Sequence, residues 1–213
     1  MTIKERIVLQ ASEMFIRSGI KAITMDDIAN ETGVSKRTIY EIFTDKNNLL
    51  KNCIDHMDTK FRQEKEVAGS EAKNIIDLIF SFIKIGVKAI NIINPLFNSD
   101  LKKYHYQIWK ETYRLSDEMH RTHIQSVIKQ GVDEGVFRDN IDVEIVGMLL
   151  SEQLRIMSDE AIFPSVRFSK AVVFENIVIN FFRGIATKKG LDLIENYMDK
   201  ESDQFVTVRK NKK

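Results

Sequence analysis

The sequence predicts an all-α fold. Proline occurs only twice and glycine nine times among the 213 residues, and apolar residues recur at helical spacing along nearly the whole chain. No run of alternating polar and apolar residues competes as a β-strand. A chain of this length buries enough surface to fold without a metal or a disulfide. We therefore expect one or two helical domains and no cofactor.

The first helix is marked by a capping box. Thr2 lies three residues before Glu5, so that a hydroxyl and a carboxylate can satisfy the N–H groups of the helix start. The chain should leave this helix at Ser18-Gly19. One face of it is apolar, with Ile3, Ile7, Ala11, Met14 and Phe15 at helical spacing.

A second capping box pairs Thr24 with Asp27 and predicts a helix that begins at Met25. It should end at Gly33, because glycine takes the left-handed conformation of a helix C-terminus without steric cost. Ser35 then caps a third helix.

The third helix separates apolar from polar positions. Ile39, Ile42 and Phe43 share one side, and the polar residues facing elsewhere are Lys36, Arg37, Thr38 and Tyr40. Two short helices joined by a glycine turn form a helix-turn-helix, whose second helix places its N-terminal residues in the DNA major groove. The pattern predicts a DNA-reading unit at the N-terminus.

Residues 3–50 resemble the TetR (tetracycline-repressor) family of bacterial transcriptional regulators. The resemblance is carried by the TMDDIA helix, by the TGVSKRTIYEIF turn and recognition helix, and by Lys46 opening the next helix. It implies a homodimer that binds a double-stranded DNA operator and responds to a small-molecule effector. The DNA contacts that it implies are Thr24, Ser35, Lys36, Arg37, Thr38, Tyr40 and Lys46.

Among these residues, Arg37 and less clearly Lys36 suit guanine O6 and N7, whereas the others suit phosphate contacts. Taken without the resemblance, Lys36, Arg37 and Lys46 are ordinary solvated cations at helix starts, where the helix dipole slightly disfavours them. The chain departs from the family pattern at Ile42, where relatives often have His or Tyr. Glu41 adds a negative charge nearby, and we expect it to pair with a neighbouring Lys or Arg.

Net charge provides little information about DNA binding. The chain carries +1 overall, and residues 3–50 balance seven Lys and Arg against seven Asp and Glu. Non-specific DNA affinity comes from neutralised phosphates, so a neutral domain should bind random DNA weakly.

We expect three regions: a DNA-binding domain at 1–46, a ligand-binding and dimerisation domain at 47–199, and a disordered basic tail at 200–213. The body should break at EVAGSEAKN, NPLFNSD, DEGVFRDNID, FPSVRFS and Gly190. The most apolar stretch, 75–93, carries a narrow polar stripe and predicts a buried helix rather than a membrane span. One cysteine and a charged N-terminus favour a cytoplasmic protein without disulfides.

An aromatic stripe in the body, which includes His105, Trp109, Tyr113 and His120, allows two interpretations, either core packing or the lining of an effector cavity. It contains no Lys or Arg, which favours a guest that is uncharged or weakly charged and partly aromatic or lipid-like. The candidate ligand contacts are Phe61, Phe80, His105, Trp109, Tyr113, His120 and Met157. His120 and His123 lie one helical turn apart, but no third ligand has metal-binding spacing, so we predict no metal. Cys53 shares an apolar face and should be a packing residue.

The last two long helices, Asp142 to Ser158 and Ser169 to Thr187, carry more apolar surface than one packed side needs. A two-fold four-helix interface would bury it. The candidate interface residues are Ile145, Leu149, Phe174, Ile177 and Phe181.

The favoured function is a repressor that a small molecule releases from a palindromic operator. One alternative is an architectural or protein-binding factor of the same fold that uses DNA as an anchor. A second is an all-helical enzyme. The sequence contains no Gly-rich phosphate loop, no nucleophile elbow and no paired carboxylates in an apolar setting, so nothing in it favours catalysis.

Overall fold

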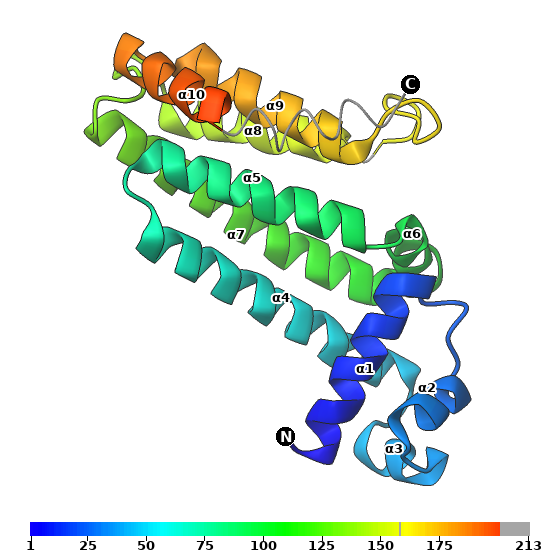
Figure 1. Cartoon of the computed structure of the whole chain (residues 1–213). Coiled ribbons are helices and arrows are strands. Elements are labelled where there is room, and N and C mark those ends of the chain that lie inside the picture. Colours follow the sequence, from blue (N-terminus) through cyan, green and yellow to red (C-terminus); the bar gives the residue numbers. More distant parts are fainter. Residues whose placement is uncertain (158, 201–213) are drawn as a thin grey trace. The chain divides into compact units, whose positions relative to one another are not determined.

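The computed structural model describes residues 1–157 and 159–200, with the backbone alone for 113–117. The described residues are helical, and an isolated β-bridge joins Phe137 to Ala186, which confirms the predicted all-α class (Figure 1). The helices are α1 (Ile3–Ser18), α2 (Met25–Thr32), α3 (Lys36–Ile42), α4 (Lys46–Glu71), α5 (Ile75–Ile92), α6 (Pro95–Tyr104), α7 (Tyr106–Asp133), α8 (Val143–Ile156), α9 (Lys170–Ile185) and α10 (Lys188–Lys200). The predicted disordered tail lies outside the described residues, apart from Lys200.

The chain divides into two compact units. Unit 1 contains residues 1–66 and 91–116, and unit 2 contains residues 67–90 and those from 117 onward. The division into compact units therefore differs from the predicted boundary at Lys46, because the first turns of α4 belong to the core of unit 1. The functional division at 46 stays a prediction.

Unit 1 is built on a core that α1, α2 and α3 share with the start of α4. Both predicted capping boxes are present, at Thr2 and Glu5 and at Thr24 and Asp27. The side chains that fill the core are fully buried, among them Ile7, Phe15, Ile28, Ile39, Phe43, Leu49 and Leu50. Burial of each large apolar side chain contributes about 1.5 to 3 kcal/mol to stability. Such packing supplies most of the stability of short helices.

Helix α6 corrects the sequence prediction at NPLFNSD. We expected a break there, but the break is confined to residues 93–94, and Pro95 opens a helix that Asn94 caps by accepting from the Leu96 N–H. Proline lacks an N–H group, but the first residue of a helix does not need one. Pro95 can therefore start α6 directly after the two-residue break that follows α5 (Ile75–Ile92).

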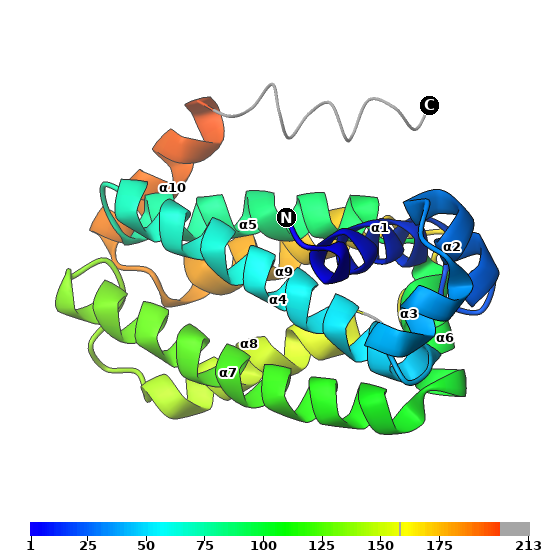
Figure 2. The ribbon, with the colours of Figure 1, turned by 90° about the horizontal axis from the view of Figure 1, so that it is seen from below.

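Unit 2 has its own apolar core. Ile76, Ile79 and Phe80 of α5 are buried with Val178 and Phe182 of α9. Helices α8 and α9 lie side by side (Figure 2). No helix among the described residues is long and apolar enough to cross a membrane.

The break predicted at Gly190 is wrong. Gly190 is buried within α10 and packs against the carbonyl of Val136, and its N–H donates to the Thr187 hydroxyl at 3.2 Å. The helix start therefore lies three residues earlier, at the threonine that caps it.

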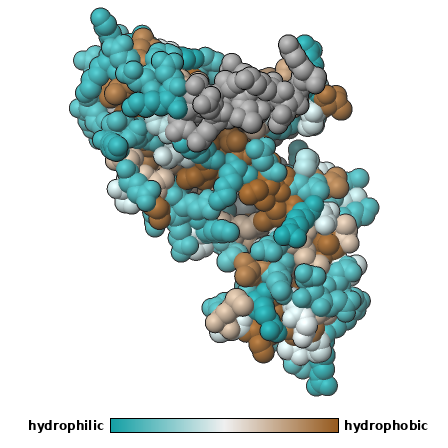
Figure 3. Space-filling model, in the orientation of Figure 1, coloured by the Kyte–Doolittle hydropathy of each residue, from teal (hydrophilic) through white to brown (hydrophobic). Residues whose placement is uncertain are grey.

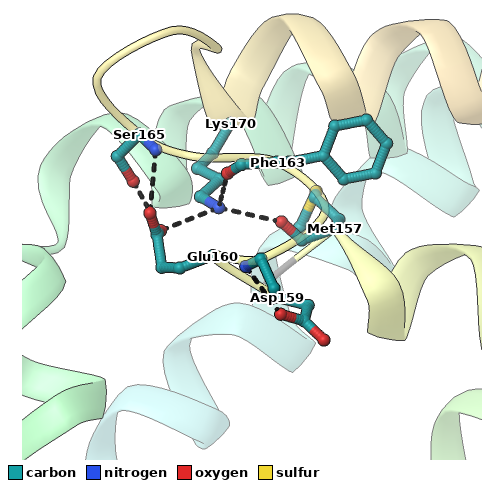
Figure 4. A network of polar contacts seen from close by, with 7 residues as sticks. Met157, Asp159, Glu160, Phe163, Ser165 and Lys170 are labelled. Carbon is teal, nitrogen blue, oxygen red and sulfur yellow. Dashed lines mark hydrogen bonds and ion pairs between the residues drawn. The ribbon is translucent and has the colours of Figure 1, made fainter.

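A polar network organises the connection between α8 and α9 (Figure 4). The Lys170 ammonium donates to the carbonyls of Met157 and Phe163 at 3.1 and 2.7 Å and lies 2.9 Å from Glu160. Glu160 also accepts from the hydroxyl and the N–H of Ser165, which lowers the pKa of its carboxyl from 4.5 to about 2. At neutral pH this carboxylate stays charged and holds the connection to the start of α9.

Candidate nucleic-acid interface

The turn between α2 and α3 has the geometry that the glycine predicted. Gly33 lies in the left-handed region, with φ 63° and ψ 27°. Its N–H donates to Asn30, and the Val34 N–H donates to the Ala29 carbonyl at 3.2 Å. The Ser35 hydroxyl then accepts from the Thr38 N–H at 3.1 Å and caps α3. The turn is fixed by short-range hydrogen bonds, so the direction of α3 relative to α2 is set locally.

Helix α3 buries its apolar side and exposes its polar one. Ile39 and Phe43 are buried, whereas Ser35, Lys36, Arg37 and Tyr40 are exposed and Thr38 is half-buried. The surface over α2 and α3 is mostly hydrophilic, with small apolar areas (Figure 3). Six of the seven predicted DNA contacts, all but Lys46, therefore lie on or beside one exposed surface of the helix-turn-helix.

Both cations of α3 are paired with carboxylates of the same domain. Lys36 Nζ lies 2.8 Å from Asp26 Oδ2, and this hydrogen bond raises the pKa of the Lys36 ammonium. Arg37 Nε lies 2.9 Å from Glu41 Oε1, one helical turn away. The expected pairing of Glu41 is confirmed.

Thr24 is exposed, but its polar atoms are engaged. The hydroxyl and the N–H both donate to the Asp27 carboxylate, at 2.6 and 2.7 Å, and the hydroxyl accepts from the Asp27 N–H. These bonds lower the pKa of Asp27. A phosphate contact at Thr24 would add to this cap or replace part of it.

Lys46 lies in a different environment from the other predicted contacts. Its half-buried ammonium donates to the Ile20 carbonyl at 2.7 Å and to the Ile23 carbonyl, and it lies 5.7 Å from the centre of the Phe15 ring. Burial lowers the pKa of the Lys46 ammonium. An ammonium has three donors, so two carbonyls leave it capable of one further bond.

Asp100 of α6 holds the same segment from another side, and the sequence analysis missed it. The buried carboxylate accepts from the Lys21 N–H at 2.7 Å. Gly19, at φ 81°, allows the close approach, since a Cβ there would meet Asp100 Oδ2 at 3.0 Å. The only local signal was an acidic residue in the middle of an otherwise apolar helix face, beside Phe97 and Leu101.

The comparison with family models connects this geometry with known proteins. The model described as bacterial regulatory proteins of the tetR family matches residues 7–53, which include α2, α3 and the first turns of α4. Residues 7–53 therefore match the TetR family. The resemblance that the motifs indicated is confirmed, including the helix-turn-helix itself.

Similar proteins are named as regulators. YvaF of Bacillus subtilis, an HTH-type transcriptional regulator, is 26% identical over 106 residues, which cover 49% of this chain and 55% of YvaF. The repressor KstR2 of Mycobacterium tuberculosis is 24% identical over 151 residues, covering 64% of this chain and 70% of KstR2. Its solved structure aligns with TM-score 0.55 and 18% identity, covering 88% of this chain and 96% of KstR2.

A regulator from Saccharomonospora viridis, solved in complex with choline, has the same fold. It aligns with TM-score 0.71 and 17% identity over 87% of this chain and 98% of that protein. These likenesses extend the family's fold beyond the helix-turn-helix to the helical body.

Four candidate ligand contacts lie in unit 1. His105 Nδ1 lies 2.6 Å from Asn47 Oδ1. Trp109 is half-buried against the core of unit 1 and stacks on Tyr106 with 5.5 Å between ring centres. Phe61 lies under the Lys65 ammonium at 4.6 Å. The Tyr113 side chain lies outside what the structure describes.

The other three ligand candidates lie in unit 2. Phe80 is 2% exposed and stacks on Tyr197 at 4.0 Å, so it is a core residue in this conformation. His120 is exposed, and Met157 is the half-buried C-cap of α8. Seven apolar side chains of this core surround a cavity of about 10 Å³, which is room for one water molecule rather than an effector.

The predicted interface residues differ in exposure. Ile145 and Leu149 of α8 are 57% and 55% exposed. Ile177 and Phe181 of α9 are half-buried against the core of unit 2, and the Phe174 ring packs against Gly86 of α5. Of the two predicted interface helices, α8 thus has the more exposed candidate residues.

Cys53 and the histidines have structural surroundings. Burial raises the pKa of the Cys53 thiol to about 12, so the thiol stays protonated and packs as an apolar group. The His123 ring lies 5.0 Å from Phe82. Within the described residues, no three metal-binding side chains form a group.

Lys46 is expected to contribute to stability as well as to DNA binding. Lys46→Met keeps the aliphatic stem but leaves the Ile20 and Ile23 carbonyls without a donor, so the free energy of unfolding in urea should fall by about 1 to 3 kcal/mol. The control is Lys51→Met on the same helix, where an exposed ion pair with Glu111 contributes about 1 kcal/mol or less. Equal losses in the two variants would rule out a structural role for Lys46.

Proposed function

We propose that this protein is a sequence-specific repressor, not an enzyme, that binds a palindromic operator as a homodimer and is released by a small molecule. The observation that carries the proposal is the capped recognition helix, which buries Ile39 and Phe43 and presents Ser35, Arg37 and Tyr40 to solvent. The names of YvaF and KstR2 support regulation of transcription. The proposed role includes a cytoplasmic location, where the protein has access to its operator.

The proposed contacts fall into two classes. Arg37 suits the guanine edge, because a guanidinium donates two parallel hydrogen bonds to O6 and N7, and Lys36 suits the same edge less well. The hydroxyls of Thr24, Ser35, Thr38 and Tyr40 and the ammonium of Lys46 suit phosphate oxygens, which fix the register of the helix in the groove.

Arg37→Ala tests the base-reading role. After selection of an operator from randomised duplexes, this variant should lose about 1 to 3 kcal/mol of operator affinity and its preference at one base position. Arg17→Ala is the matched control, because Arg17 also forms an i,i+4 pair, with Glu13 on α1. Unchanged base preference in Arg37→Ala would eliminate Arg37 as a reader.

The exposed α8 face supports the homodimer. Ile145, Met148 and Leu149 lie on adjacent turns and are 57%, 45% and 55% exposed, and helix pairs of this kind associate through such faces into four-helix bundles. A two-fold operator requires two recognition helices related by the same symmetry.

Leu149→Glu should produce a folded monomer with much weaker operator binding, because an unpaired charge in an apolar interface is costly. Leu149 is a better probe than Phe181 or Ile177, which also pack on the core of unit 2. Val67→Glu, equally exposed at 55% on α4, is the control. Sedimentation and circular dichroism measure assembly and folding, and a dimeric Leu149→Glu variant would place the interface elsewhere.

The proposed effector is an uncharged or weakly charged, partly aromatic or lipid-like molecule that contacts the α7 stripe at Trp109 and Tyr113. Aromatic side chains with a few polar tips are typical of small-molecule sites. The name of KstR2 as a ketosteroid regulator is compatible with this class. Choline, which the Saccharomonospora viridis protein binds, carries a positive charge and is a charged compound to test beside such molecules.

Effector binding should change the emission of Trp109, the single tryptophan, and lower operator affinity. By linkage, operator DNA should lower effector affinity by the same factor. A fluorescence screen followed by operator titration with each hit measures both effects. Tyr113→Ala should weaken the hits without altering operator affinity in their absence. The site is misplaced if compounds that release DNA leave both the emission and the Tyr113→Ala affinity unchanged.

A further inference from the structure

The recognition helix presents its two cations in neutral pairs. Arg37 Nε contacts Glu41 at 2.9 Å, and the two side chains are 89% and 58% exposed. Lys36 Nζ contacts Asp26 at 2.8 Å, with exposures of 50% and 63%. Such solvent-exposed pairs are weak and open easily, so they restrain the cations without removing them from the surface.

We propose that Glu41 and Asp26 are specificity-determining residues, which neutralise Arg37 and Lys36 toward the phosphates of random DNA while leaving Arg37 able to read a base. This inference rests on the proposed operator binding. It assigns a function to two acidic side chains on a surface where phosphate binding alone would favour only cations.

Non-specific DNA is bound through its phosphates. Its affinity follows the number of phosphates that the protein neutralises. A cation already paired with a carboxylate releases no counterion when it meets a phosphate, and the carboxylate itself repels the DNA. Glu41 and Asp26 therefore lower random binding, in agreement with seven positive and seven negative residues over 3–50.

Base reading at the operator needs only part of the Arg37 guanidinium. The Glu41 carboxylate contacts Arg37 at Nε, and a guanidinium has further donors on its two terminal nitrogens. These nitrogens can donate to guanine O6 and N7 while Nε stays on Glu41. The pair thus orients the guanidinium toward a base edge. Because guanine carries no net charge, the neutrality of the Arg37–Glu41 pair costs little affinity for the base.

Glu41→Gln separates the two effects, since the amide oxygen can still accept from Arg37 Nε but the charge is gone. Affinity for a scrambled duplex should rise about fivefold to tenfold at 0.1 M salt, with a salt dependence steeper by about 0.9. Operator affinity should change by less than about twofold, so selectivity falls. Asp26→Asn should act in the same direction through Lys36.

Glu13→Gln is the matched control. Glu13 also pairs at i,i+4 with an arginine, Arg17, but it lies in the half of α1 that approaches α6, away from α3 (Figure 1). It changes net charge by the same amount, and we expect less than a twofold effect on either duplex. A rise equal to that of Glu41→Gln would show a bulk charge effect and overturn the proposal.

The double variant Arg37→Ala with Glu41→Gln completes the test. If Glu41 acts through Arg37, removing its charge should raise scrambled-duplex affinity less than twofold when Arg37 is absent. An undiminished rise would overturn the proposal. A wild-type protein that binds the selected and scrambled duplexes equally would instead refute operator binding itself, so the two failures are distinguishable.

Discussion

The position of the recognition helix depends on how residues 19–24, the connection between α1 and α2, are held. Lys46 donates to two carbonyls of this segment, and Asp100 accepts from the Lys21 N–H at 2.7 Å. Helix α2 begins directly after it, at Met25, and α3 follows through a turn with little freedom. A shift of the connection would therefore move both helices of the DNA-reading unit together. Since Asp100 belongs to α6, the first helix after the long α4–α5 stretch, unit 1 is completed by residues far along the chain.

The polar groups of unit 1 are arranged according to their exposure. Where burial is substantial, as at Lys46 and Asp100, charge is matched by backbone dipoles, because an unmatched buried charge would be destabilising. Where the surface is open, as at Arg37 and Lys36, charge is matched by carboxylates that contribute little to stability. The first kind of contact fixes the scaffold. The second kind leaves the exposed cations of α3 available for other partners.

Unit 2 has a tightly packed core and an apolar face of α8 that is exposed to solvent. Phe80, Phe182 and their neighbours leave a cavity of only about 10 Å³, so this packing is close to that of a filled protein interior. The apolar residues of α8 that the core does not use are exposed instead. The connection from α8 to α9 is held by Lys170 and Glu160, so the exposed face is presented by a pair of helices whose link is itself structured. An exposed apolar helix face of this kind is suited to self-association.

Local chemistry explains what the sequence by itself determined. The capping boxes, the Gly33 turn, the Ser35 cap and the Arg37–Glu41 pair join residues at most five positions apart, so their spacing predicts them. The family motif also lies within 50 residues, and the DNA-reading unit was found from it. The tertiary structure decided the rest. Asp100 meets Lys21 across 79 positions and Lys46 meets Ile20 across 26, and no periodicity encodes such pairs. Gly190 predicted a break between helices, but it packs against Val136 and lies inside α10. Helical spacing identifies an apolar face, but which part of it is covered, as at Phe174, or left open, as at Leu149, is decided only by the helices that pack against it.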